Sequence, residues 1–240
     1  MVETVATTTL TPHQRALRST VAMKVLMAVT GLIMVGFLLM HMYGNLKMFM
    51  GPEAFDHYAE WLKGDILYPI MPKGVFIWVF RLGMVAAIVL HIYSAVVLWR
   101  RAKIANPESY QAKRRLAQTY SARTMRWGGI IVVTGLVFHL LQFTVRATLI
   151  SPEAAASHSP FVMVIGEFGI WWLVVAYAIW MVAVCMHIRH GVWSALTTLG
   201  ANTSLKAQRV LNGCAWVVAI LLYIGFMIMP VAVLTGVLHS

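Results

Sequence analysis

Five long apolar runs, separated by polar segments, dominate the sequence. A helix that crosses a membrane needs about 20 predominantly apolar residues, and each run reaches that length. The pattern predicts membrane helices at about 21–49, 75–99, 127–150, 161–190 and 210–238. We therefore expect an all-α fold, an integral membrane bundle of five transmembrane helices that forms a single domain over residues 1–240.

A shorter polar and apolar pattern follows the first run. The segment GPEAFDHYAEWLK, from Gly51 to Lys63, has the alternation of a short amphipathic helix. Tyr58 and Trp61 are amphipathic aromatic residues of the kind that gather at the headgroup level of a membrane. We expect this segment to lie on the membrane interface between the first two helices.

Composition agrees with a lipid environment. Hydrophobic residues make up 60% of the chain and charged residues 11%, whereas a soluble domain carries about 25% charged residues. The net charge of +11 would suggest nucleic acid for a soluble protein, but here the cations gather between apolar runs, which indicates a membrane surface and no nucleic acid. They are Arg15, Arg18, Lys24, Arg100, Arg101, Lys103, Lys113, Arg114, Arg115, Arg123, Arg126, Arg189, Lys206 and Arg209.

This distribution also predicts sidedness. Lysine and arginine are concentrated on the cytoplasmic side of membrane proteins, so residues 1–20 form a cytoplasmic N-terminal segment and the C-terminus lies outside. The opposite linkers hold fewer cations, balanced by acids such as Glu53, Asp56 and Glu60.

Four histidines lie within the apolar runs, where ionisable side chains are costly and usually functional. At about 1.5 Å of rise per residue, His91 and His187 fall in an inner layer, and His41 and His139 fall in an outer one. Two neutral imidazoles in each layer could serve as the axial nitrogen ligands of one iron porphyrin per layer. A single zinc ion would need all four histidines close to one point, and the two layers are too far apart for that. Each histidine taken alone is equally compatible with an interhelical hydrogen bond.

Small residues accompany these histidines at helical spacing. Gly44, Ser94, Gly135 and Gly191 each lie three or four residues from a histidine, and so on its helix face. They predict room for a flat macrocycle, although close packing of helices uses the same spacing.

With the histidines in place, the chain resembles a known family. The residues that carry the resemblance are HMYGNLKMF from His41, LHIYSA around His91, VFHLLQF around His139, and HIRHGVWSALTTLGANTSLKAQR from His187. They resemble the single-chain cytochrome b membrane anchor of succinate dehydrogenases and fumarate reductases, the five-helix, dihaem type.

The resemblance implies a membrane subunit of complex II, in a bacterial inner membrane. A flavoprotein and an iron–sulfur subunit dock on the cytoplasmic face in that family. Electrons pass from succinate through FAD and iron–sulfur clusters to two b haems and then to quinone, with menaquinone expected here. The dicarboxylate active site lies on another chain. His41 and His139 would bind the outer haem, and His91 and His187 the inner haem. The physiological direction, the quinone type and the oligomeric state of the whole complex stay open.

The resemblance also assigns the cytoplasmic surface. We expect the N-terminal segment, the basic linker after the second helix, and Ser204, Lys206 and Arg209 to dock the iron–sulfur subunit. Topology and contact with anionic lipid would explain the same charges. Candidate partners for the haem propionates are Ser19, Lys24, Arg126, Trp127 and Lys206.

A quinone site is expected on the outer side. Arg81 lies about two turns into the second helix, where an unpaired guanidinium is expensive. It could pair with a propionate or with Glu60, and Glu53, Asp56 and Glu60 are candidate proton acceptors. The alternatives are an arginine that reaches the headgroups and a quinone site on the inner side.

Three other functions compete with this one. The same parts would serve a quinol:fumarate reductase working in reverse. A transporter could use the histidines as a proton relay, although paired Gly/Pro interruptions are absent from the helices. Cys185 and Cys214 could join two histidines around a Rieske-like cluster, but membrane-buried cysteines are usually small hydrophobes. His190 is interpreted as interfacial.

Overall fold

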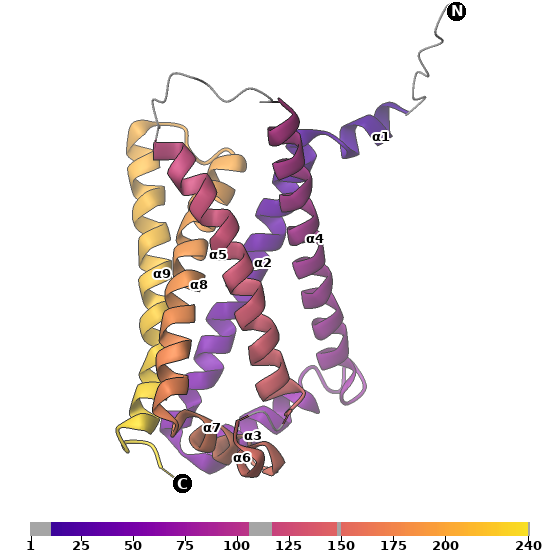
Figure 1. The fold of residues 1–240 in the computed structure, drawn as a ribbon. Coiled ribbons are helices and arrows are strands. Elements are labelled where there is room, and N and C mark those ends of the chain that lie inside the picture. The colour runs from indigo at the N-terminus through magenta and orange to yellow at the C-terminus, as the bar shows by residue number, and fades with distance from the viewer. Residues whose placement is uncertain (1–10, 106–116, 148–149, 240) are drawn as a thin grey trace, which may run out of the picture.

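The computed structural model describes residues 11–105, 117–147 and 150–239. Long helices run side by side, and short helices gather at one end (Figure 1). In order along the chain the elements are α1 (Pro12–Leu17), α2 (Thr20–Leu46), η1 (Lys47–Met50), α3 (Pro52–Lys63), α4 (Val75–Ala105), α5 (Ala117–His139), η2 (Leu140–Thr144), α6 (Pro152–Ala156), α7 (Pro160–Phe168), α8 (Trp171–Thr198) and α9 (Leu205–Leu234).

The predicted all-α membrane fold is confirmed. The described residues contain helices and no strand, and five helical segments are long and apolar enough to cross a membrane. These are α2 with η1, α4, α5 with η2, α8 and α9. The chain is therefore a multi-pass membrane protein. Its spans alternate in direction, so α3, α6, α7 and the C-terminal residues share one end of the bundle (Figure 1).

The two ends of the bundle differ in charge and structure. We call the end with α3, α6 and α7 the short-helix end. The opposite end, called the basic end, holds α1, the last turns of α4, the first turns of α5 and the α8–α9 turn (Figure 1). Described cations such as Arg101, Arg126 and Lys206 lie at this basic end.

The amphipathic segment after the first span forms α3, as predicted. Gly51 allows the chain to turn into it, because its φ of 95° is one that side-chain-bearing residues rarely adopt. Asp56 of α3 binds the start of α7. Its carboxylate accepts hydrogen bonds from the Phe161 N–H at 2.9 Å and from the Ser159 hydroxyl. Asp56 thus caps α7 and joins two short helices.

Two predicted boundaries were wrong. The helix expected at 161–190 is two helices, because Gly169 ends α7 and Ile170 adopts extended backbone before α8 begins. The second span continues to Ala105, so Arg100, Arg101 and Lys103 lie on α4 rather than in a loop. Lys113, Arg114 and Arg115, predicted for the docking surface, lie outside the described residues.

Packing is unequal among the five spans. In their most apolar stretches, 39% of residues in α8 and 44% in α9 are buried, against 6% in α4 and in α5. The α8–α9 pair contacts α2, whereas α4 packs mainly on α2 and α5 mainly on α8. α2 and α5 therefore pack directly on the well-packed α8–α9 pair, and α4 joins the bundle mainly through α2.

Candidate functional site

The four membrane histidines meet as two pairs, each contributed by two helices. His41 of α2 and His139 of α5 have ring centroids 5.9 Å apart. His91 of α4 and His187 of α8 have ring centroids 6.4 Å apart. The structure thus brings together the histidines that residue counting places in one layer. We call them the outer pair and the inner pair.

The two pairs lie at different depths. His91 contacts Thr30 of α2, and Thr30 precedes His41 by eleven residues on the same helix. At 1.5 Å per residue this separates the pairs by about 16 Å. On α5, Gly129 faces His187 and precedes His139 by ten residues, which gives about 15 Å. Two independent helices therefore give the same spacing between the layers.

The ring spacing fits two nitrogen ligands on one metal ion. Imidazole nitrogen binds a metal at about 2.0–2.1 Å, so two rings on opposite sides of one ion have centroids about 6 Å apart. Aromatic rings in simple contact also lie about 4.5–7 Å apart, so the ring spacing is compatible both with metal ligation and with ring packing. The described residues hold no group of three or more His, Cys, Asp or Glu side chains placed for a metal. Two ligands per layer suit a porphyrin, which brings four nitrogens of its own.

The same observation weighs against the Rieske-like alternative. Such a cluster takes two cysteines and two histidines, and no such group forms within the described part of the chain. Cys185 is buried and Cys214 is exposed, and both are free thiols.

His91 is held in one tautomer by the backbone. Its Nδ1 lies 3.1 Å from the Met27 carbonyl, which can only accept, so Nδ1 carries the hydrogen. Thr30 lies 3.2 Å from the same nitrogen and donates its own hydrogen to the Leu26 carbonyl at 2.7 Å. The opposite nitrogen, Nε2, therefore keeps its lone pair, the arrangement found in metal-binding histidines.

His139 is held by side chains instead. Its Nδ1 lies 3.3 Å from the Tyr177 hydroxyl, which donates to Gln142 at 2.7 Å. Gln142 in turn donates to Glu167. Reasoning from the sequence missed these residues, although a glutamine and a glutamate inside apolar segments are unusual. His187 differs again, because its buried Nδ1 has no partner among the described residues.

Glycines face the inner pair, but they are not the ones expected. A Cβ on Gly31 would lie 3.3 Å from Cε1 of His91, and one on Gly129 would lie 3.7 Å from Cε1 of His187. The expected space at Gly44 is taken by the Tyr58 ring, and the space at Gly135 is taken by the Trp180 indole. Those two spacing predictions were wrong.

The remaining two small residues, Gly191 and Ser94, differ in whether they leave room beside the histidine. A Cβ on Gly191 would meet no atom within 4 Å, so this glycine does leave room on its helix face. Ser94 is fully buried and donates to the His91 carbonyl at 2.9 Å, so its hydroxyl supports α4 itself.

The predicted propionate partners all lie towards the basic end but come from three helices. Ser19 caps α2 by accepting from the Ala22 N–H at 3.0 Å, and Lys24 is exposed on the same helix. Arg126 and Trp127 are exposed on α5, and Lys206 is exposed at the start of α9.

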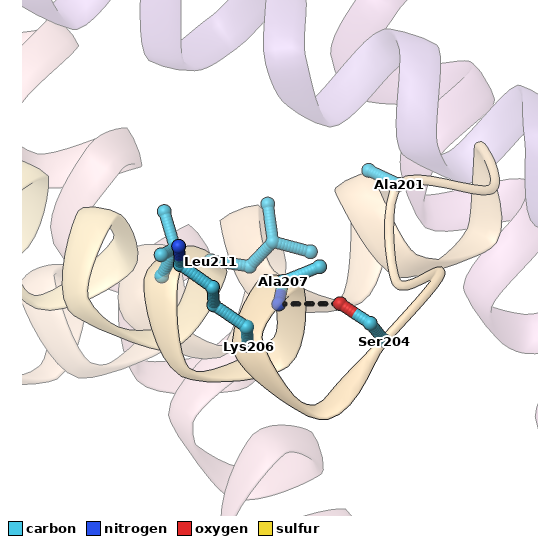
Figure 2. A pocket seen from close by; sticks show the side chains of 6 residues that line it. Ala201, Ser204, Lys206, Ala207 and Leu211 are labelled. Carbon is cyan, nitrogen blue, oxygen red and sulfur yellow. Dashed lines mark hydrogen bonds between the residues drawn. The ribbon is translucent and has the colours of Figure 1, made fainter.

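A shallow hollow lies beside Lys206 at the basic end. It is lined by Ala201, Ser204, Lys206, Ala207, Val210 and Leu211. Figure 2 shows the Ser204 hydroxyl accepting from the Ala207 N–H, a bond of 3.1 Å that caps α9. Ser204 therefore shapes this surface through the helix start, while Lys206 supplies its charge.

The structure does not pair the two candidate quinone residues with each other. Arg81 is exposed near the short-helix end of α4, and its guanidinium lies 5.0 Å from the Trp78 ring centroid. Glu60 is exposed on α3 at the same end. Beside it, partial burial and the neighbouring Tyr43 raise the pKa of Tyr58 above its ordinary value. Tyr58 is therefore neutral at physiological pH.

An arginine within α8 ties this helix to α9. Arg189 donates to the Asn212 side chain at 2.8 Å, and its guanidinium lies 4.9 Å from the Trp216 ring centroid. His190, predicted to be interfacial, is partly buried beside Trp193 on α8. These contacts stiffen the helix that presents His187.

Comparisons of the chain with protein families, with curated proteins and with solved structures gave no match.

Proposed function

We propose that this chain is the dihaem cytochrome b membrane anchor of a succinate:quinone oxidoreductase. The observation that carries the proposal is the pair of facing histidines at each of two depths. A proton relay would need neighbouring titratable groups within hydrogen-bond reach, whereas the two layers lie about 16 Å apart. Separate two-ligand sites are the arrangement that two haems require.

The protein's part in this function is to hold two haems and to orient their histidine ligands. His41 and His139 would hold one b haem, and His91 and His187 the other. Each haem, when bound, supplies reversible one-electron transfer. Met27 and Thr30 fix the ring of His91 so that Nε2 faces away from α2. The α8–α9 core, tied by Arg189 and Asn212, sets the position of His187.

The basic end is proposed to dock an iron–sulfur subunit. Arg101 of α4 donates to the Arg18 carbonyl at 2.6 Å and to the Thr20 hydroxyl at 3.2 Å, so part of its charge anchors the start of α2. Lys206 and Arg209 are exposed at the start of α9. These two cations can meet an acidic partner surface, with the flavoprotein bound beyond it. The basic end is then cytoplasmic, in the inner membrane of a bacterium.

The quinone is proposed to react at the short-helix end. Arg81 and Glu60 both lie there, and Glu60 is exposed where it can exchange a proton with a quinone oxygen, giving one when succinate reduces the quinone and taking one when a quinol is oxidised in the reverse direction. Asp56 is a weaker candidate than its spacing suggested, because its carboxylate is committed to α7. Proton exchange at this end would occur outside the cytoplasm, and menaquinone is the quinone we expect.

The test is purification of the tagged chain in mild detergent from membranes of its own cells. We expect two b haems per chain, a bound flavoprotein and iron–sulfur protein, and reduction of both haems by succinate. A chain without a b-type absorption band contradicts the haem assignment. A band that succinate cannot reduce contradicts the assignment to complex II, and fumarate-driven oxidation of the reduced haems would identify the reverse physiological direction.

A further inference from the structure

A line of hydrogen-bonded side chains leads from the outer histidine pair towards the short-helix end. Tyr177 lies 3.3 Å from His139 Nδ1 and donates to Gln142 Oε1 at 2.7 Å. The Gln142 amide donates to Glu167 Oε2 at 2.5 Å. Gln142 and Glu167 are 3% and 2% exposed. A carboxyl group buried this deeply is costly unless it is hydrogen-bonded, so its place at the end of this line needs an explanation.

The direction of the line follows from the number of hydrogens. Tyr177 has one hydroxyl hydrogen, and it is used on Gln142. The Tyr177 oxygen can therefore only accept from His139, so Nδ1 of His139 carries a hydrogen and Nε2 keeps its lone pair. This is the tautomer that the Met27 carbonyl imposes on His91.

Glu167 fixes this direction. For a carboxylate, turning the Gln142 amide over would bring the amide oxygen against a Glu167 oxygen, and two acceptors would meet. The carboxyl group therefore selects the amide orientation, the amide selects the role of the tyrosine hydroxyl, and the hydroxyl selects the histidine tautomer.

We propose that Glu167 is a positioning residue for the outer pair, which through Gln142 and Tyr177 sets the tautomer of His139 and lowers the reduction potential of the haem bound there. This inference rests on the proposed haem function. A carboxylate linked to a ligand histidine raises the basicity of that ligand. Negative charge also favours the oxidised, more positive iron, so the one-electron couple moves to lower potential without any proton transfer.

The inner pair provides an internal reference. His91 is bound by a neutral carbonyl and a hydroxyl, and His187 Nδ1 has no partner among the described residues. A change at Glu167 should therefore act on one haem and not on the other. A general disturbance of the bundle would instead act on both haems.

The experiment is a redox titration of both haems in the purified complex, followed by optical and electron paramagnetic resonance spectra. The outer haem is the one lost in His41→Ala. Glu167→Gln keeps the acceptor oxygen but removes the charge. A unit charge acting across roughly a dozen ångströms changes such an equilibrium by about tenfold, which is about 59 mV for one electron. We expect the outer potential to rise by about this amount and the inner potential to stay.

Two further variants complete the test. Glu153→Gln removes an exposed carboxyl from α6 at the same end and should move neither potential. Tyr177→Phe should raise the outer potential and change its resonance signal, and it carries the test if Glu167→Gln fails to assemble. A two-haem complex in which the tested variant leaves the outer potential unchanged, or moves both haems equally, overturns the inference. A wild-type chain without haem instead overturns the proposed function.

Discussion

The outer and inner histidine pairs have different surroundings. At the outer pair, Phe37 and Phe226 lie beside His41, and Trp180 lies beside His139. At the inner pair, Gly31 and Gly129 face the rings, and a backbone carbonyl holds His91. The outer site is thus bordered by aromatic side chains and connected to a carboxyl group, whereas the inner site is bordered by two glycines, a backbone carbonyl and the Thr30 hydroxyl.

These surroundings determine which substitutions can alter each histidine pair. A backbone carbonyl cannot be changed by a side-chain substitution, so the Met27 contact of His91 persists in any side-chain variant. The two glycines that face the rings make the inner pair sensitive to added volume. The outer pair depends on a line of polar side chains, so it is sensitive to single substitutions far from the ligands. The outer pair is also the one closer to the short-helix end, where we propose that quinone reacts.

The largest effect is expected from volume added beside the inner pair. Gly31→Leu and Gly129→Leu would push a side chain against His91 and His187, because Cβ positions there already lie 3.3 Å and 3.7 Å from the rings. We expect loss of the inner haem and retention of the outer haem, measured as haem per protein.

Matched controls lie on the same two helices. Gly36 of α2 and Gly128 of α5 have no atom within 4 Å of a Cβ position. Gly36→Leu and Gly128→Leu should keep both haems. Equal loss in these controls would mean that leucine harms the helices themselves, and the two sites would then not differ in their sensitivity to volume.

The next effect concerns quinone turnover at the short-helix end. Glu60→Gln should lower succinate:quinone activity by about 100-fold if Glu60 passes a proton to the quinone oxygen as the quinone is reduced, and Arg81→Leu should lower it as well. Both variants should keep two haems. Glu53→Gln is the control, because Glu53 is exposed on the same helix. Wild-type turnover in both variants would contradict a quinone site at the short-helix end and favour one at the basic end.

A smaller effect is expected in stability. Gln142→Leu leaves the Tyr177 hydroxyl and the Glu167 carboxyl without their present partner. Each buried group left unpaired costs about 1–3 kcal/mol, so the variant should unfold at a lower temperature in detergent. Exposed Gln208 of α9 offers the control, since Gln208→Leu should leave the midpoint unchanged. An unchanged midpoint in Gln142→Leu would show that the line of hydrogen bonds does not form.

The smallest effect is expected at the cap of α7. Asp56→Ala removes the acceptor for the Phe161 N–H and the Ser159 hydroxyl. Loss of such a cap costs about 0.5–2 kcal/mol. We expect faster hydrogen exchange in α7 with both haems retained. Exchange in α7 that matches the wild type would show that Asp56 of α3 does not stabilise α7, the helix that carries Glu167.

The sequence predicted the spans because their length and composition are imposed by lipid. The depths of His41 and His91 could be counted for the same reason, since a helix rises by a fixed amount per residue. The break at Gly169 and Ile170 could not be predicted, because residues on both sides of it are apolar and the pattern runs on.

The surroundings of the histidines were harder to predict. Helical spacing places Gly44 and Gly135 on the same face as a histidine, but it does not say which neighbour lies opposite. Tyr58 and Trp180 fill those positions from other helices. Likewise, Gln142 and Glu167 are 25 residues apart, and only the tertiary fold brings them together.

The assignment of four histidines to two haems in two defined pairs is tested most directly by haem content and the resonance spectrum of four single variants. These are His41→Ala, His91→Ala, His139→Ala and His187→Ala. We expect two haems in the wild type and one signal lost in each variant, with the His41 and His139 variants losing one signal and the His91 and His187 variants losing the other. Two haems retained in all four variants, or losses that pair the histidines differently, would contradict the assignment.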